Sequence, residues 1–79
     1  MIFLINMTKA SLVNDINELR RLVKEKTNFK YLPELSEIDL KYFGYRKFES
    51  FKKSVLESYL EELINICFDN RIISSAYDF

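Results

Sequence analysis

The chain has 79 residues, with twelve basic and twelve acidic side chains, one cysteine, one glycine, one proline and no histidine. One cysteine cannot form an intrachain disulfide, and the lack of histidine removes a common zinc ligand and the commonest general base. No signal-peptide pattern and no run of about 20 apolar residues is present, so we expect a cytoplasmic domain that does not enter a membrane.

The composition is that of a globular chain, because 48% of the residues are hydrophobic and 15% are aromatic. The scarcity of glycine and proline favours long helices over short strands. We therefore predict a single all-α domain over residues 1–79. It has three helices, at about residues 9–27, 33–43 and 46–69, and apolar N- and C-terminal tails.

The first predicted helix, residues 9–27, has the clearest pattern. Thr8 or Ser11 can cap it, because a side-chain oxygen there accepts from free N–H groups of the first turn. Apolar residues then recur at intervals of three and four, which predicts one buried face. They are Leu12, Ile16, Leu19 and Val23.

The second predicted helix, residues 33–43, lies between the only proline and the only glycine. Pro33 suits the first turn of a helix, where its missing N–H is not needed. Gly44 is expected to end the helix in the left-handed conformation that glycine adopts without a steric penalty.

The third predicted helix, residues 46–69, has an apolar stripe that widens in its second half. A stripe of this width exceeds what one neighbouring helix covers. Either the first two helices enclose it from two sides, or part of it contacts another chain.

The two ends of the chain, residues 2–5 and 72–79, are apolar without a clear period. They could pair as a short ribbon, which would make the fold α+β. Because an isolated two-stranded ribbon is marginal in water, we favour apolar tails.

The charges are separated along the chain although they cancel in total. Residues 41–56 carry five basic side chains against one acidic, a net charge of +4. Residues 57–79 carry one basic side chain against five acidic, a net charge of −4. Such polarity can orient the docking of a partner.

The residue types argue against catalysis. A serine or cysteine nucleophile would have no histidine to activate it, and one glycine cannot form a phosphate-binding loop. The acidic residues at positions 57, 61 and 62 are typical of a solvated helix face. We expect no enzyme activity, no metal and no cofactor.

The first functional hypothesis is a small regulatory or adaptor protein that binds another protein or a second copy of itself. It includes inhibitors of host factors encoded by phages and mobile elements, a class suggested by size alone. The excess apolar surface supports protein binding, and tyrosine and phenylalanine are common interface residues. The expected binding residues are Tyr59, Leu60, Leu63, Ile64, Tyr77 and Phe79.

The alternative hypothesis is a DNA- or RNA-binding protein of the helix-turn-helix type. A helix, a turn at Gly44 and a second helix resemble that outline, and basic residues interleaved with aromatic ones suit phosphates and bases. The expected contacts are Lys41, Arg46, Lys47, Lys52 and Lys53.

Overall fold

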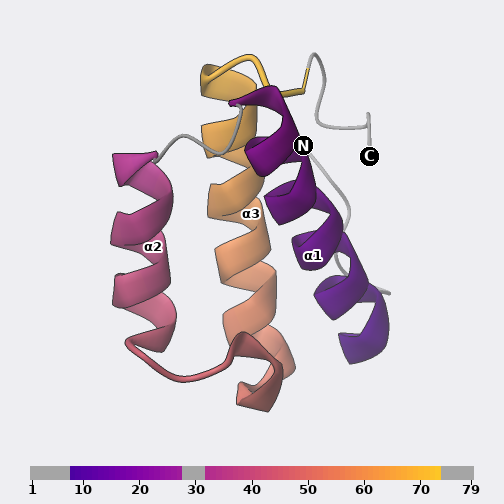
Figure 1. Ribbon diagram of the computed structural model, residues 1–79. Coiled ribbons are helices and arrows are strands. Elements are labelled where there is room, and N and C mark those ends of the chain that lie inside the picture. The colour runs from indigo at the N-terminus through magenta and orange to yellow at the C-terminus, as the bar shows by residue number, and fades with distance from the viewer. Residues whose placement is uncertain (1–7, 28–31, 74–79) are drawn as a thin grey trace.

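A computed structural model describes residues 8–27 and 32–73 as a bundle of helices (Figure 1). No strand occurs in these two ranges, which confirms the all-α prediction. The suggested ribbon between the chain ends, and most of both predicted tails, fall outside the described residues. The elements are α1 (Lys9–Lys26), α2 (Pro33–Phe43), a 3₁₀ turn η1 (Phe48–Ser50) and α3 (Lys53–Asp69).

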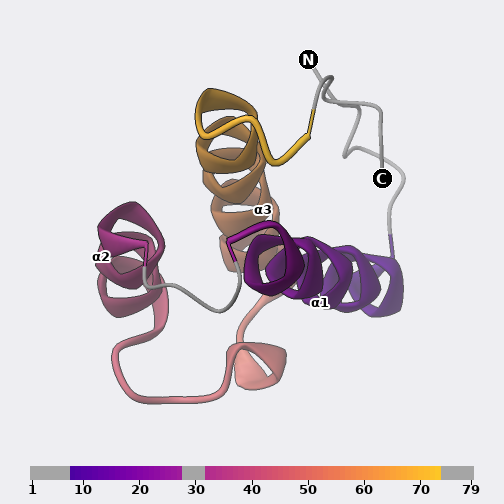
Figure 2. The same ribbon diagram turned by 45° about the horizontal axis from the view of Figure 1, so that its top comes forward.

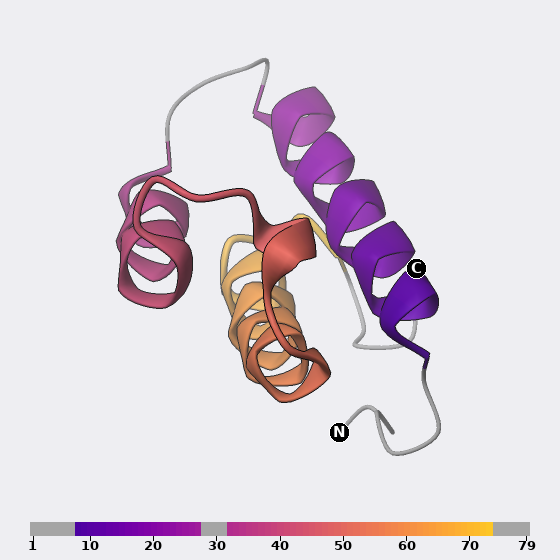
Figure 3. The same ribbon diagram turned by 90° about the horizontal axis from the view of Figure 1, so that it is seen from below.

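Helix α3 is the central element, because it packs against both α1 and α2. Helices α2 and α3 run antiparallel beside each other, whereas α1 lies across the bundle (Figures 1 and 2). The view from below shows α2 and α3 end-on and α1 along its length (Figure 3). The apolar stripe of α3 is therefore covered from two sides.

Helix α1 forms as its sequence predicts. The Oγ1 of Thr8 accepts a hydrogen bond of 3.0 Å from the backbone N–H of Ser11, which caps the first turn. The predicted apolar face is the buried one. It consists of Leu12, Ile16, Leu19 and Val23.

Helix α2 begins at Pro33 and ends at Phe43, as expected, but Gly44 ends it in a different way. The backbone of Gly44 has φ 61° and ψ −123°, which is not the left-handed helical conformation. The N–H of Arg46 donates to the carbonyl of Phe43 at 3.1 Å. These features define a type II′ turn with glycine at its first central position, so the predicted cap geometry is wrong.

Helix α3 begins at Lys53 and not near residue 46. Residues 48–50 form a separate 3₁₀ turn, and the backbone is extended at Phe51 and Lys52. The reason is tertiary, because the rings of Phe48 and Phe51 lie 6.0 and 5.0 Å from the ring of Phe43. A straight helix through residues 46–52 would carry the two rings away from the end of α2.

The C-terminal end of α3 folds the chain back over the core. The N–H of Ile72 donates to the carbonyl of Cys67 at 2.7 Å, and that of Arg71 donates to Phe68 at 3.1 Å. This pair of bonds is a Schellman motif, in which Arg71 holds the position of positive φ that usually belongs to glycine. As a result, Ile72 and Ile73 are buried in the core.

We expect Arg71→Gly to stabilise the protein by about 1 kcal/mol, because glycine adopts positive φ without the steric cost of a Cβ atom. Urea unfolding followed by circular dichroism would measure this. Arg71→Ala is the matched control, since it removes the same side chain and keeps the Cβ. An equal gain from both variants would contradict the backbone explanation.

The thiol of Cys67 faces the core, and burial raises its pKa from 9.0 to about 11. The unfolded chain therefore loses this proton at a lower pH than the folded chain. The thiol's contribution to stability is complete below about pH 9 and is lost as the pH rises toward 11. The stability advantage of the wild type over Cys67→Ala should fall by about 1.4 kcal/mol per pH unit in this window. A difference that stays constant in urea unfolding from pH 8 to pH 11 would contradict this prediction.

Candidate functional site

The structure places the predicted apolar binding residues inside the molecule. Tyr59, Leu60 and Leu63 are 0% exposed, and Ile64 is 5% exposed. In the folded chain these four side chains are therefore part of the core and do not form a surface for another chain. Tyr77 and Phe79, the other two predicted binding residues, lie outside the described residues.

The large apolar side chains that do reach solvent in residues 8–27 and 32–73 lie on separate elements. Leu40 on α2 is 58% exposed, Tyr45 after α2 is 100% exposed, and Phe68 at the end of α3 is 51% exposed. Scattered exposed residues of this kind are ordinary on a protein surface. Tyr45 differs because two basic residues, Arg46 and Lys47, follow it directly.

We call residues 44–53 the basic loop. It connects α2 to α3 at one end of the bundle (Figure 3). Within the part of the chain that the structure describes, the side chains of Lys47, Lys52 and Lys53 form no hydrogen bond or ion pair, and all three are exposed. The guanidinium of Arg46 stacks on the ring of Phe51 at 4.6 Å. Four of the five predicted cations, Arg46, Lys47, Lys52 and Lys53, therefore lie in the basic loop.

The fifth predicted cation, Lys41, is engaged elsewhere. Its ammonium lies 3.2 Å from the carboxylate of Glu62 and 5.2 Å from the ring of Tyr42. The hydroxyl of Tyr42 also donates to Glu62, which raises the pKa of Tyr42 to about 12 and lowers the pKa of Glu62. This group joins α2 to α3 on the surface, so Lys41 is not an available cation of the basic loop.

The helix-turn-helix outline is wrong for α2 and α3. That motif joins its helices through a turn of roughly three or four residues, at an angle of about 90–120°. Here the connection covers residues 44–52 and includes η1, and the two helices lie antiparallel (Figure 1). The cations are therefore presented by a loop and by the first residue of α3.

A cavity of about 350 Å³ lies under the basic loop. Side chains of α1 and α2 line it together with the loop itself. The set includes two arginines, two phenylalanines and two acidic residues. Its lining residues are Arg20, Asp39, Phe43, Gly44, Tyr45, Arg46, Lys47, Phe48 and Glu49.

A hydrogen-bonded group that joins all three helices borders this cavity. Nη1 of Arg20 on α1 lies 3.0 and 2.9 Å from the two carboxylate oxygens of Asp39 on α2. It also donates to the hydroxyl of Tyr59 on α3 at 2.7 Å, and that hydroxyl donates to Asp39 at 2.5 Å. Burial, the largest effect, and the bond to Asp39 raise the pKa of Tyr59. The phenol therefore stays neutral and acts as a donor.

Arg20 and Asp39 are site residues that the sequence does not reveal. The two are 19 positions apart, on different helices, and each resembles an ordinary residue of a solvated face. No local pattern marks them, because the group exists only once the helices have packed.

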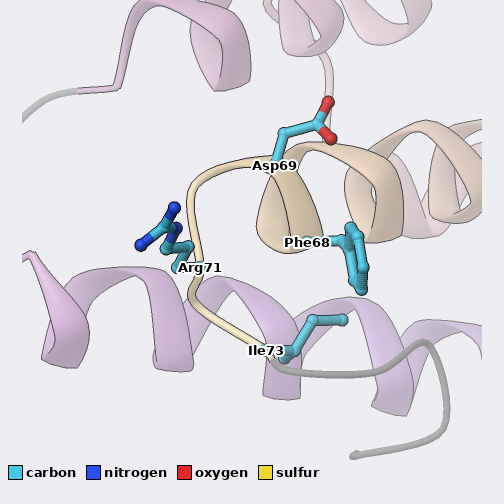
Figure 4. A pocket seen from close by; sticks show the side chains of 4 residues that line it. All are labelled: Phe68, Asp69, Arg71 and Ile73. Carbon is cyan, nitrogen blue, oxygen red and sulfur yellow. The ribbon is translucent and has the colours of Figure 1, made fainter.

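A second cavity, of about 460 Å³, lies between the end of α3 and the chain that follows it. Figure 4 shows Phe68 and Ile73 on one side, with Asp69 and Arg71 directed away from them. No set of polar groups converges there among the described lining residues. This cavity is larger, but it offers less recognition chemistry than the one under the basic loop.

Within residues 8–27 and 32–73, no cluster of acidic or cysteine residues is suited to a metal ion. Over the same ranges, none of the helices has the length and apolar character of a membrane span. Comparison with protein-family models, curated proteins and solved structures finds no match. The basic loop and the cavity below it are therefore the features of the described residues that bear on function.

Tyr59→Phe should destabilise the protein by about 1–3 kcal/mol, because it removes one donor and one acceptor from a partly buried group. Tyr42→Phe is the matched control, since it deletes the same atom from the more exposed group with Glu62. That variant should cost less than about 1 kcal/mol. Urea unfolding of both variants measures the difference, and equal costs would contradict a central role for Tyr59.

Proposed function

We propose that this chain is a non-catalytic protein-binding domain whose basic loop docks on an acidic surface of a partner protein. The observation that supports it best is Tyr45, which is fully exposed and is followed in the loop by cations without internal partners. Folding alone does not require a tyrosine there. Tyrosine and arginine are the residue types that contribute most to binding at protein interfaces.

The loop is partly ordered for binding. The type II′ turn sets the backbone at Gly44 and Tyr45, and the stack on Phe51 holds the guanidinium of Arg46. A side chain that is already held in place loses less conformational entropy when a partner binds. Tyr45 and Arg46 are therefore the expected anchors of the interface.

The charge around the start of α3 also favours an acidic partner. Lys52 and Lys53 lie at the positive end of the helix dipole, where no acidic residue is present in the first turn and no side chain caps the helix. This arrangement costs α3 some stability. An acidic surface placed against the loop would relieve the repulsion and speed association.

Glu49 favours a protein partner over a nucleic acid. This exposed carboxylate lies within the basic loop, where it would repel a phosphate backbone. Nucleic-acid-binding domains also usually carry a net positive charge, and this chain has none. A mixed surface with one carboxylate among several cations is ordinary at a protein interface.

Nucleic-acid binding is the second candidate, and one observation favours it. The exposed ring of Tyr45 beside Arg46 and Lys47 could stack on a base while the two cations contact phosphates. Both candidates use the same loop. A single experiment at position 45 separates them.

We expect a photo-crosslinking benzoylphenylalanine at Tyr45 to capture a protein in cells that express the chain. The adduct should resist nuclease, be degraded by protease, and not form from the same probe at Leu40, which is exposed on α2. An adduct of twice the chain mass would identify a second copy as the partner. A nuclease-sensitive adduct would support the second candidate instead, and the absence of any adduct would overturn both.

Two double variants test whether capture of the partner depends on the positive charge of the basic loop. Lys47→Glu with Lys53→Glu should abolish the adduct, because it reverses two free cations of the loop. Lys24→Glu with Lys26→Glu changes the net charge equally, at exposed residues in the last turn of α1, and should leave it intact. Equal losses from both pairs would show that overall charge, and not the basic loop, governs capture.

A further inference from the structure

Arg20 uses only part of its hydrogen-bonding capacity inside the protein. Its Nη1 donates hydrogen bonds to Asp39 and Tyr59, whereas Nε and Nη2 form no hydrogen bond within residues 8–27 and 32–73. The side chain is 33% exposed and lines the cavity under the basic loop. An arginine with a free Nε–Nη2 edge has two parallel donors that match the two oxygens of one carboxylate.

The cavity is suited to strengthen such a contact. The guanidinium carbon of Arg20 lies 6.0 Å from the centre of the Phe48 ring, and Phe43 provides a second apolar wall. Because the side chain of Arg20 is only 33% exposed, its charge interactions are stronger than those on an open surface. Because Asp39 and Tyr59 already hold Nη1, the free edge of the guanidinium is fixed before a ligand arrives.

The charges around the cavity favour a ligand with a single negative charge. Arg20, Arg46 and Lys47 contribute three positive charges, and Asp39 and Glu49 contribute two negative ones. One positive charge is left over. A carboxylate balances it, whereas a phosphate dianion would bring a surplus of negative charge close to Asp39 and Glu49.

We infer that this cavity receives an aspartate or glutamate side chain of the partner protein, held by the Nε–Nη2 edge of Arg20. The inference rests on the proposed function and makes it more specific. Tyr45, Arg46 and the lysines attract an acidic surface, and Arg20 selects one carboxylate of that surface. The cavity then sets the register of docking, which a flexible basic surface cannot do by itself.

NMR with ¹⁵N-labelled protein tests this directly, because the Nε–H of Arg20 has its own resonance. The probe is N-acetyl-glutamate N-methylamide, and the neutral glutamine analogue is the matched control. We expect a saturable shift of the Arg20 Nε–H signal and of the Gly44 and Phe48 amides with the carboxylate only. Shifts of equal size with both compounds, or none with the carboxylate, would overturn the inference. A stronger response to inorganic phosphate would also overturn it.

Two variants separate binding by Arg20 from its structural role. Arg20→Lys keeps the positive charge but loses the two-donor edge. The affinity for the carboxylate, measured from the Gly44 and Phe48 shifts, should therefore fall by about tenfold or more. Tyr59→Phe removes one partner of Nη1 but leaves the two Asp39 contacts and the Nε–Nη2 edge, so its affinity should fall far less than that of Arg20→Lys. If the affinities of both variants fall in proportion to their stabilities, Arg20 has a structural role only.

The two proposals fail in different ways. If the model carboxylate produces no shift but the probe at Tyr45 still captures an acidic protein, the cavity inference is wrong and the proposed function stands. If the wild type forms no adduct at all, the proposed function is wrong. In that case a carboxylate shift at Arg20 would describe a small-molecule site, and the inferred role in docking a partner protein would fall with the proposed function.

Discussion

The hydroxyl of Tyr59 is the point on which the arrangement of the three helices depends. The ring of Tyr59 is fully buried on α3, so its polar atom must find partners inside the protein. It finds them in Asp39 of α2 and Arg20 of α1. A shift of either neighbouring helix along α3 would leave a buried or partly buried polar group unpaired, which costs more than a typical hydrogen bond contributes. The group therefore selects one register for the bundle.

This register has two consequences for function. It encloses the apolar stripe of α3, so an exposed apolar face of this helix is not available for recognition in the folded chain. In this register Nη1 of Arg20 forms hydrogen bonds with Asp39 and Tyr59. The Nε–Nη2 edge of the same guanidinium has no partner among the described residues. Under the proposed function, recognition therefore uses a polar region, where a loop rich in cations lies above a cavity with an arginine in its lining.

Two turns complete the enclosure of the core, and each has an unusual backbone. The type II′ turn at Gly44 lets Phe48 and Phe51 fold back over Phe43. The Schellman motif at Arg71 directs Ile72 into the core, although a non-glycine residue holds the strained position. In a domain of this size the margin of stability is small, so burial gained by these short segments matters.

The sequence by itself determined the features that depend on neighbouring residues. The spacing of Leu12, Ile16 and Leu19 identified the buried face of α1, Thr8 was one of the two caps it allowed, and Pro33 and Gly44 marked the ends of α2. These predictions hold because helix periodicity, caps and proline or glycine effects act within a few residues.

Only the tertiary structure decided the rest. The start of α3 moved to Lys53 because aromatic contacts with α2 outweigh the helical preference of residues 46–52. The burial of Leu63 depends on helices that lie elsewhere in the chain. The pairing of Arg20 with Asp39 and Tyr59 joins residues 19 and 39 positions apart. Such contacts leave no local pattern, because they arise from the packing of helices that one stretch of sequence does not specify.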